Sequence, residues 1–508
     1  MKMIKGLVLG SVAGLLAVGG AQAADLPLKA KAVEYVKVCS LYGAGFWYIP
    51  GTDTCIKLGG YLRVDVLANT NSVDTGNVNG PAGAKNRFTN AYTWRSREDL
   101  NIDTRTATEY GVLRTYADLR FNWTDDSFTQ NAPGATVYSA IGPAPFGSAP
   151  NNANAGAVAA GTVGTYYAFI QFAGFTIGKT VSAFSTPWHN YPGNNFDGLV
   201  GGGGTDTGVN QFTYTAEFGQ GISASISAQD PTQSYQAGVN NLGVPGGFGY
   251  GTSDYGGTVA PDIVGQVRVD QAWGLFQASV AAHDNHAAYY GATEPSGHPD
   301  DRWGWAGQLG LSIKNIPTGP GDVINLQGVY TDGATRYNIQ DLAAQYGAVL
   351  LFGSSNVAYQ SLGFGFAPDT VFASGGSQQL IQTWGFNGGY THNWNPYWNS
   401  SIYGGYAAVR YNGTAKALMC GPGGTVAVLL TPGDTCNPDY NIAQVGFVTR
   451  WTPVKNLTFS GDVTWSQLDQ KYAGTVTFGS LGIAKPTTAY ELKNENNVVL
   501  LLRAQRIW

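Results

Sequence analysis

Charged side chains recur at every second position in the stretch WRSREDLNIDTR, which begins at Trp94. Alternate residues of an extended strand share one face, so this stretch places its arginines and aspartates side by side. The neighbouring segments 56–68 and 110–123 repeat the pattern. We expect the three segments to form one charged wall, made of Lys57, Arg63, Asp65, Arg95, Arg97, Asp99, Asn101, Asp103, Arg105, Arg114, Asp118 and Arg120.

Two roles are open for this wall, and both concern electrostatics rather than catalysis. The charges pair with one another for structure alone, or they set a field across an aqueous space and select the solutes that pass. Either role requires hydration, because an unpaired charge in an apolar interior is very costly. Glu98 falls on the opposite face of its strand, and a β-bulge near it is one explanation.

Acids that would face this wall lie in the segment 184–208, which is rich in Gly and Pro and has no Lys or Arg. Folded into an aqueous space, the segment would narrow the passage and set acid against arginine. The alternative is a disordered external loop that ends in a run of four glycines. The candidate constriction residues are Arg63, Arg95, Arg97, Arg114, Asp118, Arg120, Asp197 and Asp206.

Patterns for catalysis and metal binding are weak in this chain. His283-Asp284 at a strand end would suit an outer-membrane protease or lipase, but a histidine at a loop is more often a solvated residue. We find no GxSxG, no phosphate-binding glycine loop and no histidine at zinc-ligand spacing from the cysteines. We therefore predict a protein that is not an enzyme and that uses no cofactor and no metal.

The four cysteines form two sets with the same spacing, Cys39 to Cys55 and Cys420 to Cys436. In an exported protein, disulfides are the default role for such residues. Three connectivities are open, and local pairing within each set is the most economical. Each local bond would close a loop for about 3 kcal/mol in the chain-entropy model.

Strict alternation identifies the elements that must position these residues. In RWGWAGQLGLSIKN, which begins at Arg302, the apolar Trp303, Trp305 and Leu309 interleave with the polar Gln308 and Ser312, as in a β-strand with one wet face. The same pattern predicts sixteen strands, at 56–68, 92–105, 110–123, 163–173, 174–183, 209–218, 221–229, 262–271, 274–283, 302–314, 322–331, 380–392, 399–411, 440–452, 457–467 and 496–508.

The connections between these strands alternate regularly between short turns and long segments. A soluble β-sandwich, the rival fold, gives no reason for this alternation, whereas an outer-membrane barrel has short periplasmic turns and long extracellular loops. We therefore predict an all-β, 16-stranded antiparallel transmembrane β-barrel. A barrel of this size is too wide for side chains to fill, so the polar faces line water and the apolar faces meet lipid.

Composition and the chain start agree with export. Residues 1–23 carry Lys2 and Lys5, an apolar stretch and an Ala-Gln-Ala end, which predict a secretory signal peptide. The rest lacks the roughly 18-residue apolar run of a transmembrane helix. Only 12% of residues are charged and the formal net charge is −5, which disfavours a nucleic-acid partner. The predicted organisation is signal peptide 1–23, an N-terminal segment 24–54 and a barrel 55–508.

Three stretches, CSLYGAGFWYIPGTDTCIKLGGYLRVD, SREDLNIDTRTATEYGVLRTYADLRF and YYAFIQFAGFTIGKT, together with the end RAQRIW, resemble the alphaproteobacterial general porins of Brucella and rhizobial type. The resemblance covers essentially the whole mature chain and is strongest in its first third. It implies a homotrimeric, 16-stranded diffusion channel with a third loop folded inside, and a terminal aromatic, Trp508, that is presented to the barrel assembly machinery. The third loop here carries few acids, a departure that weakens the expected polarisation of the constriction.

We expect a passive porin of the outer membrane, surrounded by lipid, through which ions and small hydrophilic solutes diffuse. The rival hypothesis is a structural or adhesive outer-membrane barrel with a plugged lumen. Segment 24–54 would supply such a plug or a periplasmic contact, and the residues do not decide between the two. We also predict that the last strand, ending at Trp508, closes the barrel beside the first strand.

Overall fold

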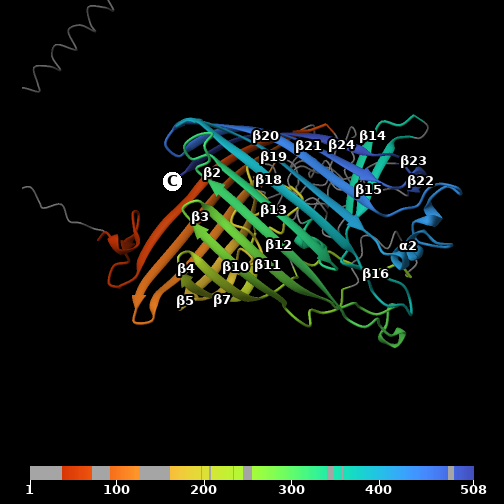
Figure 1. Ribbon diagram of the computed structural model, residues 1–508, viewed down its shortest axis with the longest axis horizontal. Helices are drawn as coiled ribbons and strands as arrows, with labels where there is room; N and C mark the ends of the chain where they lie inside the picture. Colours follow the sequence, from red (N-terminus) through yellow and green to blue (C-terminus); the bar gives the residue numbers. More distant parts are fainter. Residues whose placement is uncertain are drawn as a thin grey trace, which may run out of the picture.

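The computed structural model forms a closed β-barrel whose strands run obliquely between two unlike ends (Figure 1). It describes residues 37–70, 92–124, 161–195, 197–204, 207–232, 234–243, 255–339, 348–356, 359–478 and 486–508. The predicted signal peptide 1–23 and the candidate residue Asp206 lie outside the described residues. In this part of the chain no helix has both the length and the apolar character needed to cross a membrane.

Sixteen antiparallel strands make the wall, each paired with its neighbours in chain order. The last pairs with the first, Leu502 opposite Val66, so the barrel is closed. The strands are β2 (Cys55–Asn69), β3 (Tyr92–Thr108), β4 (Gly111–Thr124), β5 (Gly161–Phe172), β6 (Phe175–Thr180), β7 (Val209–Gly219), β8 (Ile222–Gln229), β10 (Asp262–Gln271), β11 (Gly274–Asn285), β12 (Arg302–Lys314), β13 (Val323–Asp332), β18 (Gln382–Asn395), β19 (Trp398–Arg410), β20 (Tyr440–Val454), β21 (Leu457–Gln470) and β24 (Glu495–Ile507).

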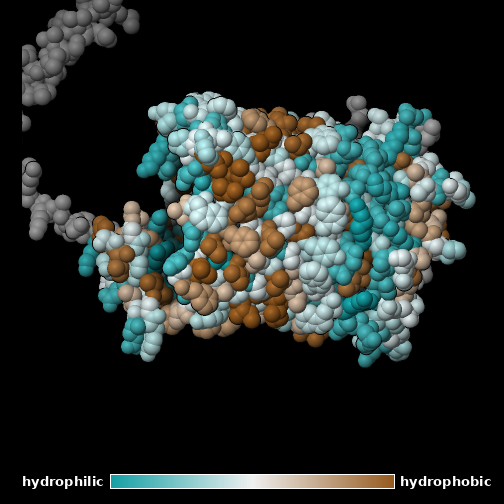
Figure 2. Space-filling model, viewed as in Figure 1, coloured by the Kyte–Doolittle hydropathy of each residue, from teal (hydrophilic) through white to brown (hydrophobic). Residues whose placement is uncertain are grey.

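The predicted fold class is confirmed, and the alternation along β12 shows why. Trp303 and Leu309 are 51% and 60% exposed on the outer face, whereas Gln308 and Ser312 are buried on the inner face. Figure 2 shows a band of apolar side chains across the outer face of the barrel, with hydrophilic residues gathered toward the end that bears the long loops. A polar interior and an apolar exterior require water inside and hydrocarbon outside.

Glu98 lies on the outer face, as its place in the alternation requires, but the suggested bulge near it is wrong. The ladder runs unbroken through Glu98, which stands opposite Leu62 of β2 and Phe121 of β4. The register of this region shifts instead between β4 and β5, where Asp118 pairs with Tyr167 and Leu119 with Thr165. Tyr166 is therefore an extra residue in its strand.

The two ends of the barrel differ in the length of their connections. We call them the short-turn end, where β3 and β4 are joined by Glu109 and Tyr110, and the long-loop end. Beyond the sixteen strands lie short elements that the alternation did not predict: η1 (Ser40–Tyr42), β1 (Trp47–Tyr48), β9 (Val239–Asn241), η5 (Glu294–Ser296), η6 (Thr335–Tyr337), β14 (Ala348–Gly353), β15 (Ser361–Phe366), β16 (Thr370–Phe372), β17 (Gln379–Leu380), α2 (Gly413–Cys420), η7 (Ala427–Leu429), β22 (Gly474–Phe478) and β23 (Thr488–Leu492).

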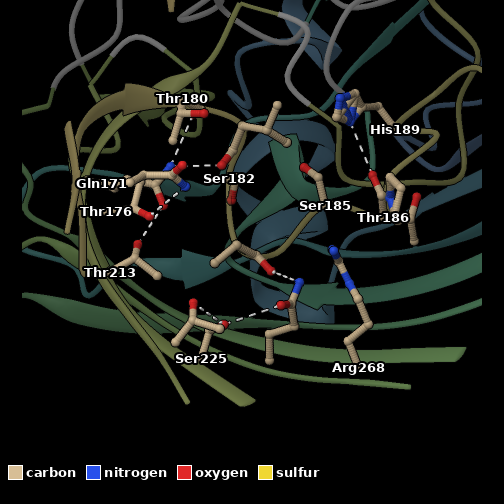
Figure 3. Close-up of a pocket in the computed structure, with 16 residues that line it drawn as sticks. Gln171, Thr176, Thr180, Ser182, Ser185, Thr186, His189, Thr213, Ser225 and Arg268 are labelled. Atoms are coloured by element: carbon tan, nitrogen blue, oxygen red, sulfur yellow. Dashed lines mark hydrogen bonds between the residues drawn. The ribbon is translucent and has the colours of Figure 1, made fainter. Parts of the chain in front are cut away.

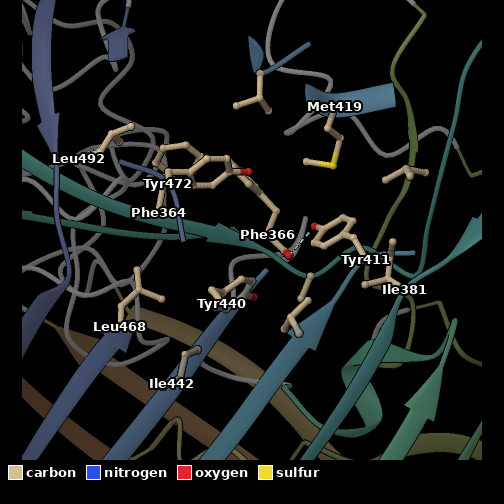
Figure 4. Packing of buried hydrophobic residues seen from close by; sticks show 14 of the residues in the cluster. Phe364, Phe366, Ile381, Tyr411, Met419, Tyr440, Ile442, Leu468, Tyr472 and Leu492 are labelled. Carbon is tan, nitrogen blue, oxygen red and sulfur yellow. Dashed lines mark hydrogen bonds between the residues drawn. The ribbon is translucent and has the colours of Figure 1, made fainter. Parts of the chain in front are cut away.

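The long loops build a packed layer over their end of the barrel. Strands β14, β15, β23 and β22 form a separate four-stranded sheet. Its buried side chains pack with those at the ends of the wall strands, and Phe364 stacks on Tyr472 with ring centroids 4.4 Å apart (Figure 4). The cluster also contains Met419 of α2, next to the disulfide between Cys420 and Cys436. This end therefore has an apolar core of its own.

At the short-turn end, the N-terminal residues from 37 to 54 form a compact knob. A disulfide joins Cys39 to Cys55, the first residue of β2, with the Cα atoms 6.0 Å apart. Phe46, a residue of this knob, is buried, and the guanidinium of Arg105 lies 4.9 Å from the centroid of its ring. Each disulfide therefore joins the two cysteines of one set, which is the local pairing that was predicted.

Candidate functional site

The segment 184–208 enters the barrel, and inward-facing amide side chains hold its main chain. Gln277 of β11 donates to the carbonyls of Phe184 (3.1 Å) and Ser185 (3.0 Å). Gln327 of β13 donates to the carbonyl of His189 at 2.7 Å. Because buried peptide groups must find partners, a loop inside a barrel needs such donors.

The second half of the segment is held in the same way on the other side of the barrel. Gln444 of β20 accepts from the Val200 N–H (2.8 Å) and donates to the carbonyl of Gly198 (3.1 Å). Arg450, six residues further along the same strand, donates to the carbonyl of Gly193 at 2.6 Å. The described part of the segment therefore crosses the lumen from β11 to β20.

The glycine run at 201–204 is buried rather than solvated. Gly201 has a φ of +93°, and a Cβ at this position would overlap the carbonyl of Phe386 on β18. Close approach of the loop to the wall thus requires a residue without a side chain. The glycines serve packing, not the flexibility that an external loop would need.

Asp197 lies where the segment approaches β24. Its Oδ1 accepts a hydrogen bond from the Tyr191 hydroxyl at 2.6 Å. Asp197 and Tyr191 are both within electrostatic range of Arg503, an inward-facing residue of β24. Nearby, Asn195 donates from its N–H to Asp462 of β21 at 2.7 Å. These contacts place the one described candidate acid of the segment beside the charged wall.

Most charges of the wall are paired with each other. Asp65 of β2 joins Arg95 (2.6 Å) and Arg503 (2.7 Å), so it links three strands. Arg120 of β4 lies 2.8 Å from Asp99. The third group joins Asp103 to Arg105 at 2.9 Å and to Arg114 at 3.0 Å. The structural role considered for the wall therefore holds for these residues.

Arg63 and Arg97 differ from the other arginines of the wall. Each donates to a neutral amide oxygen, Arg63 to Gln505 at 2.8 Å and Arg97 to Asn122 at 2.6 Å. Within the described ranges, neither lies within 4.0 Å of a carboxylate oxygen. The two guanidinium groups are therefore held by neutral partners rather than by direct ion pairs.

The β-bulge supplies an aromatic contact to this cluster. Tyr166, the extra residue of β5, lies under two guanidinium groups, with its ring centroid 3.6 Å from the Arg120 Cζ and 5.8 Å from that of Arg97. An aromatic face attracts a cation without neutralising it. Tyr166 thus contacts one arginine that is ion-paired, Arg120, and one that is not, Arg97, without neutralising either.

Three residues of this site were not among the residues predicted from the sequence. Arg503 and Gln505 lie inward on β24, and barrel closure places them beside β2. Their inward parity was visible in the sequence. Tyr166 gave no such signal, because the bulge changes the face on which it lies.

The catalytic alternative finds no geometric support. His283 is fully buried between Asp262, with Nδ1 to Oδ1 at 2.8 Å, and Asp369 at 3.6 Å, and its Nε2 lies 3.0 Å from the Tyr255 hydroxyl. Asp284, the neighbour in sequence, is not its partner in these contacts. His283 therefore ties loops of the long-loop end together. No group of three or more His, Cys, Asp or Glu in the described chain is arranged to hold a metal.

Comparisons with known proteins agree with this architecture. The family described as "Porin subfamily" matches residues 25–501. Porin Omp2b of Brucella suis biovar 1 is 34% identical over 285 residues, which cover 56% of this chain and 66% of that protein, slightly less than two thirds of its length. Porin Omp2b of Brucella melitensis is 33% identical over the same length. The crystal structure of the outer membrane channel DcaP of Acinetobacter baumannii superposes with a TM-score of 0.56 at 15% identity, covering 91% of this chain and 99% of that one.

Proposed function

Because the chain belongs to the porin subfamily, whose pattern matches residues 25–501, we propose that it is a passive, water-filled channel of the outer membrane. Ions and small hydrophilic solutes diffuse through it, and no chemical step takes place. The observation that supports this most is the polar segment 184–208, held inside a barrel whose inner face is hydrophilic and charged. In such a pore, selectivity comes from width and lining charge.

The segment 184–208 and the charged wall form the constriction in this proposal. Arg63 and Arg97 supply positive charge that no local carboxylate cancels, and Asp197 supplies negative charge from the loop side. A field between them orients dipolar solutes in a narrow, poorly screened space. Because the uncancelled arginines outnumber Asp197, the constriction prefers anions.

The rival function, a plugged structural or adhesive barrel, is less well supported. The described N-terminal residues, 37 to 54, form a knob on Cys39–Cys55 and pack against Arg105 at the short-turn end. A compact segment that packs at the rim of the barrel is poorly placed to fill its lumen. We therefore propose that this segment lies in the periplasm, where it makes a contact and does not block the channel.

A homotrimer is part of the proposal, and Glu98 supports it. Its carboxylate lies on the outer face between Leu62 and Phe121, where hydrocarbon would leave it without a polar partner. An acidic side chain that faces lipid also costs free energy, by an amount that grows with its depth and stays below the roughly 2–4 kcal/mol of an arginine or lysine at the midplane. A subunit interface on this side provides a partner, and lipid covers the apolar remainder of the belt.

Conductance in a planar lipid bilayer tests the proposed function. Purified protein, shown by heat-modifiable migration to be folded, should insert with discrete, ohmic current steps. A salt gradient should give a reversal potential of the sign expected for anion preference. Folded protein that inserts without any current would support the plugged barrel, and a cation-selective current would contradict the assignment of the constriction.

A further inference from the structure

A second polar region lies in the lumen on the side of the inward loop that faces away from the charged wall of β2 to β4 and toward β5 to β8 and β10. The first part of the inward loop, from Thr180 to His189, and the inner faces of β5 to β8 and β10 enclose a cavity of about 450 Å³ (Figure 3). This volume is within the range of roughly 300–1,000 Å³ that is common for small-molecule sites. It is therefore large enough for one small solute and its water.

The lining of this cavity has an unusual composition. Of its sixteen residues, eight carry hydroxyl groups and three are glutamines, and no carboxylate and no aromatic ring other than a histidine is among them. Thr215 and Ser225, 2.9 Å apart, and Gln266 belong to three successive wall strands and form one hydrogen-bonding row. Such a surface can both donate to and accept from a solute that carries several hydroxyl groups.

One cation completes the lining. Arg268 of β10 donates from Nε and Nη2 to a single acceptor, Gln277 Oε1, at 3.1 and 2.8 Å. Arg268 has no ion pair with another described residue. Two acids of the barrel, Glu217 on β7 and Asp270 on β10, are neighbours of Arg268 in the strand ladder. Neither lines the cavity, and Asp270 lies 3.7 Å from Lys314. A guanidinium with spare N–H groups suits a carboxylate.

We propose that this cavity is a weak binding site for small polyhydroxylated monoanions, of the hydroxy-carboxylate class. The Arg268 guanidinium takes the carboxylate, and the row of Thr215, Ser225 and Gln266 takes the hydroxyl groups. The inference rests on the proposed function, because a solute reaches the site through the channel. It goes further in giving the channel a saturable site for one class of solute.

The position of Arg268 makes it distinct from the constriction. It lies near the turn that follows β10, at the short-turn end of the wall, whereas Arg63 and Arg97 belong to β2 and β3. Gln277 connects the two regions, since it accepts from Arg268 and also holds the loop carbonyls of Phe184 and Ser185. Arg268 therefore shares a hydrogen-bonding partner with the part of the loop that enters the lumen.

Inhibition of chloride current by gluconate tests the proposal. Sodium gluconate should reduce the chloride conductance of the wild-type channel in a saturable way. Sorbitol, which has the hydroxyl groups without the charge, and propionate, which has the charge without them, should inhibit far less. Arg268→Gln should weaken gluconate inhibition about tenfold or more, because a hydrogen bond to a charged group is lost. Arg268→Lys should weaken it less.

Two further variants separate the site from the general field and from loop damage. Arg63→Gln should lower anion preference but leave the half-inhibiting gluconate concentration unchanged. Thr215→Val, which does not touch the loop anchor Gln277, should weaken inhibition a few-fold. The proposal is wrong if gluconate inhibition is not saturable in a conducting channel, or if Arg63→Gln and Arg268→Gln weaken it equally. A channel that does not conduct at all would instead refute the proposed function.

Discussion

Arg63 and Arg97 stand directly opposite each other on β2 and β3, two like charges in one rung of the ladder. Like charges in this arrangement repel, so a purely structural wall would not contain them. Neutral amides and the rings of Tyr61 and Tyr166 hold the two guanidinium groups in place. The pair is therefore the part of the wall that we assign to ion selection.

Replacing Arg97 by Ser should shift permeability toward cations. A unit charge about 8 Å from a passing ion contributes about 0.5 kcal/mol in water, favourable for an anion and unfavourable for a cation, so its removal changes the ratio of permeabilities roughly sixfold. Arg114→Ser should shift permeability in the same direction, because it leaves Asp103 with Arg105 alone and so removes the net positive charge of that group. Reversal potentials in a salt gradient measure both variants, and unchanged potentials in both would show that these arginines do not set the field.

Asp197→Asn should shift selectivity in the opposite direction, toward anions. The substitution removes the negative charge that lies beside Tyr191 and within electrostatic range of Arg503. Tyr191→Phe is the complementary control, since it removes the hydrogen bond and keeps the carboxylate, whereas Asp197→Asn retains a side-chain oxygen that accepts from Tyr191. If both variants change the reversal potential alike, the position of the loop matters and the charge of Asp197 does not.

Deletion of Trp508 should lower the yield of assembled, heat-modifiable protein in the outer membrane. The Trp508 N–H donates to the Gly60 carbonyl at 3.1 Å, and β24 pairs with β2 up to Ile507. The last residue thus takes part in the closure of the barrel. Trp508→Phe keeps the main chain and a terminal aromatic and should assemble normally, so a defect as large as that of the deletion would contradict this explanation.

Removing the disulfide between Cys420 and Cys436 should loosen the long-loop end and leave the barrel intact. The bond closes a loop with a sequence separation of 16, which is worth about 3 kcal/mol in the chain-entropy model. The double variant Cys420→Ser, Cys436→Ser should be cut faster by protease within the segment from α2 to β20. Heat-modifiable migration should stay unchanged, and loss of the folded band would show that the barrel itself depends on the bond.

The turn before β13 should lose stability only in strong acid. Asp322 is buried, which raises the pKa of its carboxyl, but hydrogen bonds from Thr318, the Asn393 N–H and His392 outweigh burial and lower that pKa below its usual range. A lowered pKa stabilises the fold above the ordinary value of about 3.9, and this contribution disappears as the pH falls through the folded-state value.

Thermal unfolding midpoints between pH 7 and pH 2 check this expectation for Asp322. The wild-type midpoint should fall below about pH 4 by more than that of Asp322→Asn, which lacks the titrating group. Thr318→Val, which removes one donor to the carboxylate, should show an intermediate dependence. A wild-type midpoint that falls in parallel with that of Asp322→Asn would show that other groups govern the acid response.

The strands could be predicted because the barrel imposes one rule on all of them. Lipid outside and water inside enforce a period of two over a dozen residues, and 302–314 was predicted with its observed bounds. The layer at the long-loop end obeys no such rule. There β15 pairs in parallel with β23, so that Ser361 stands opposite Glu491, and only the folded barrel brings the two segments together.

The charged wall was likewise predicted in its composition but not in its pairing. Parity along β2, β3 and β4 placed its arginines and aspartates on one face. It did not reveal that Asp65 takes Arg503 as a second partner, because this contact depends on closure between residues 438 positions apart. The sequence therefore predicted more uncancelled charge than the structure has.

The inward loop is fastened through its main chain, and this has an evolutionary consequence. Gln277, Gln327 and Gln444 bond to its carbonyl and N–H groups, which every residue type except proline provides. Loop side chains such as Asp197 are therefore open to substitution without loss of the path of the loop. As long as the barrel amides are kept, such substitutions can change the solute preference of the channel one loop residue at a time without rebuilding its architecture.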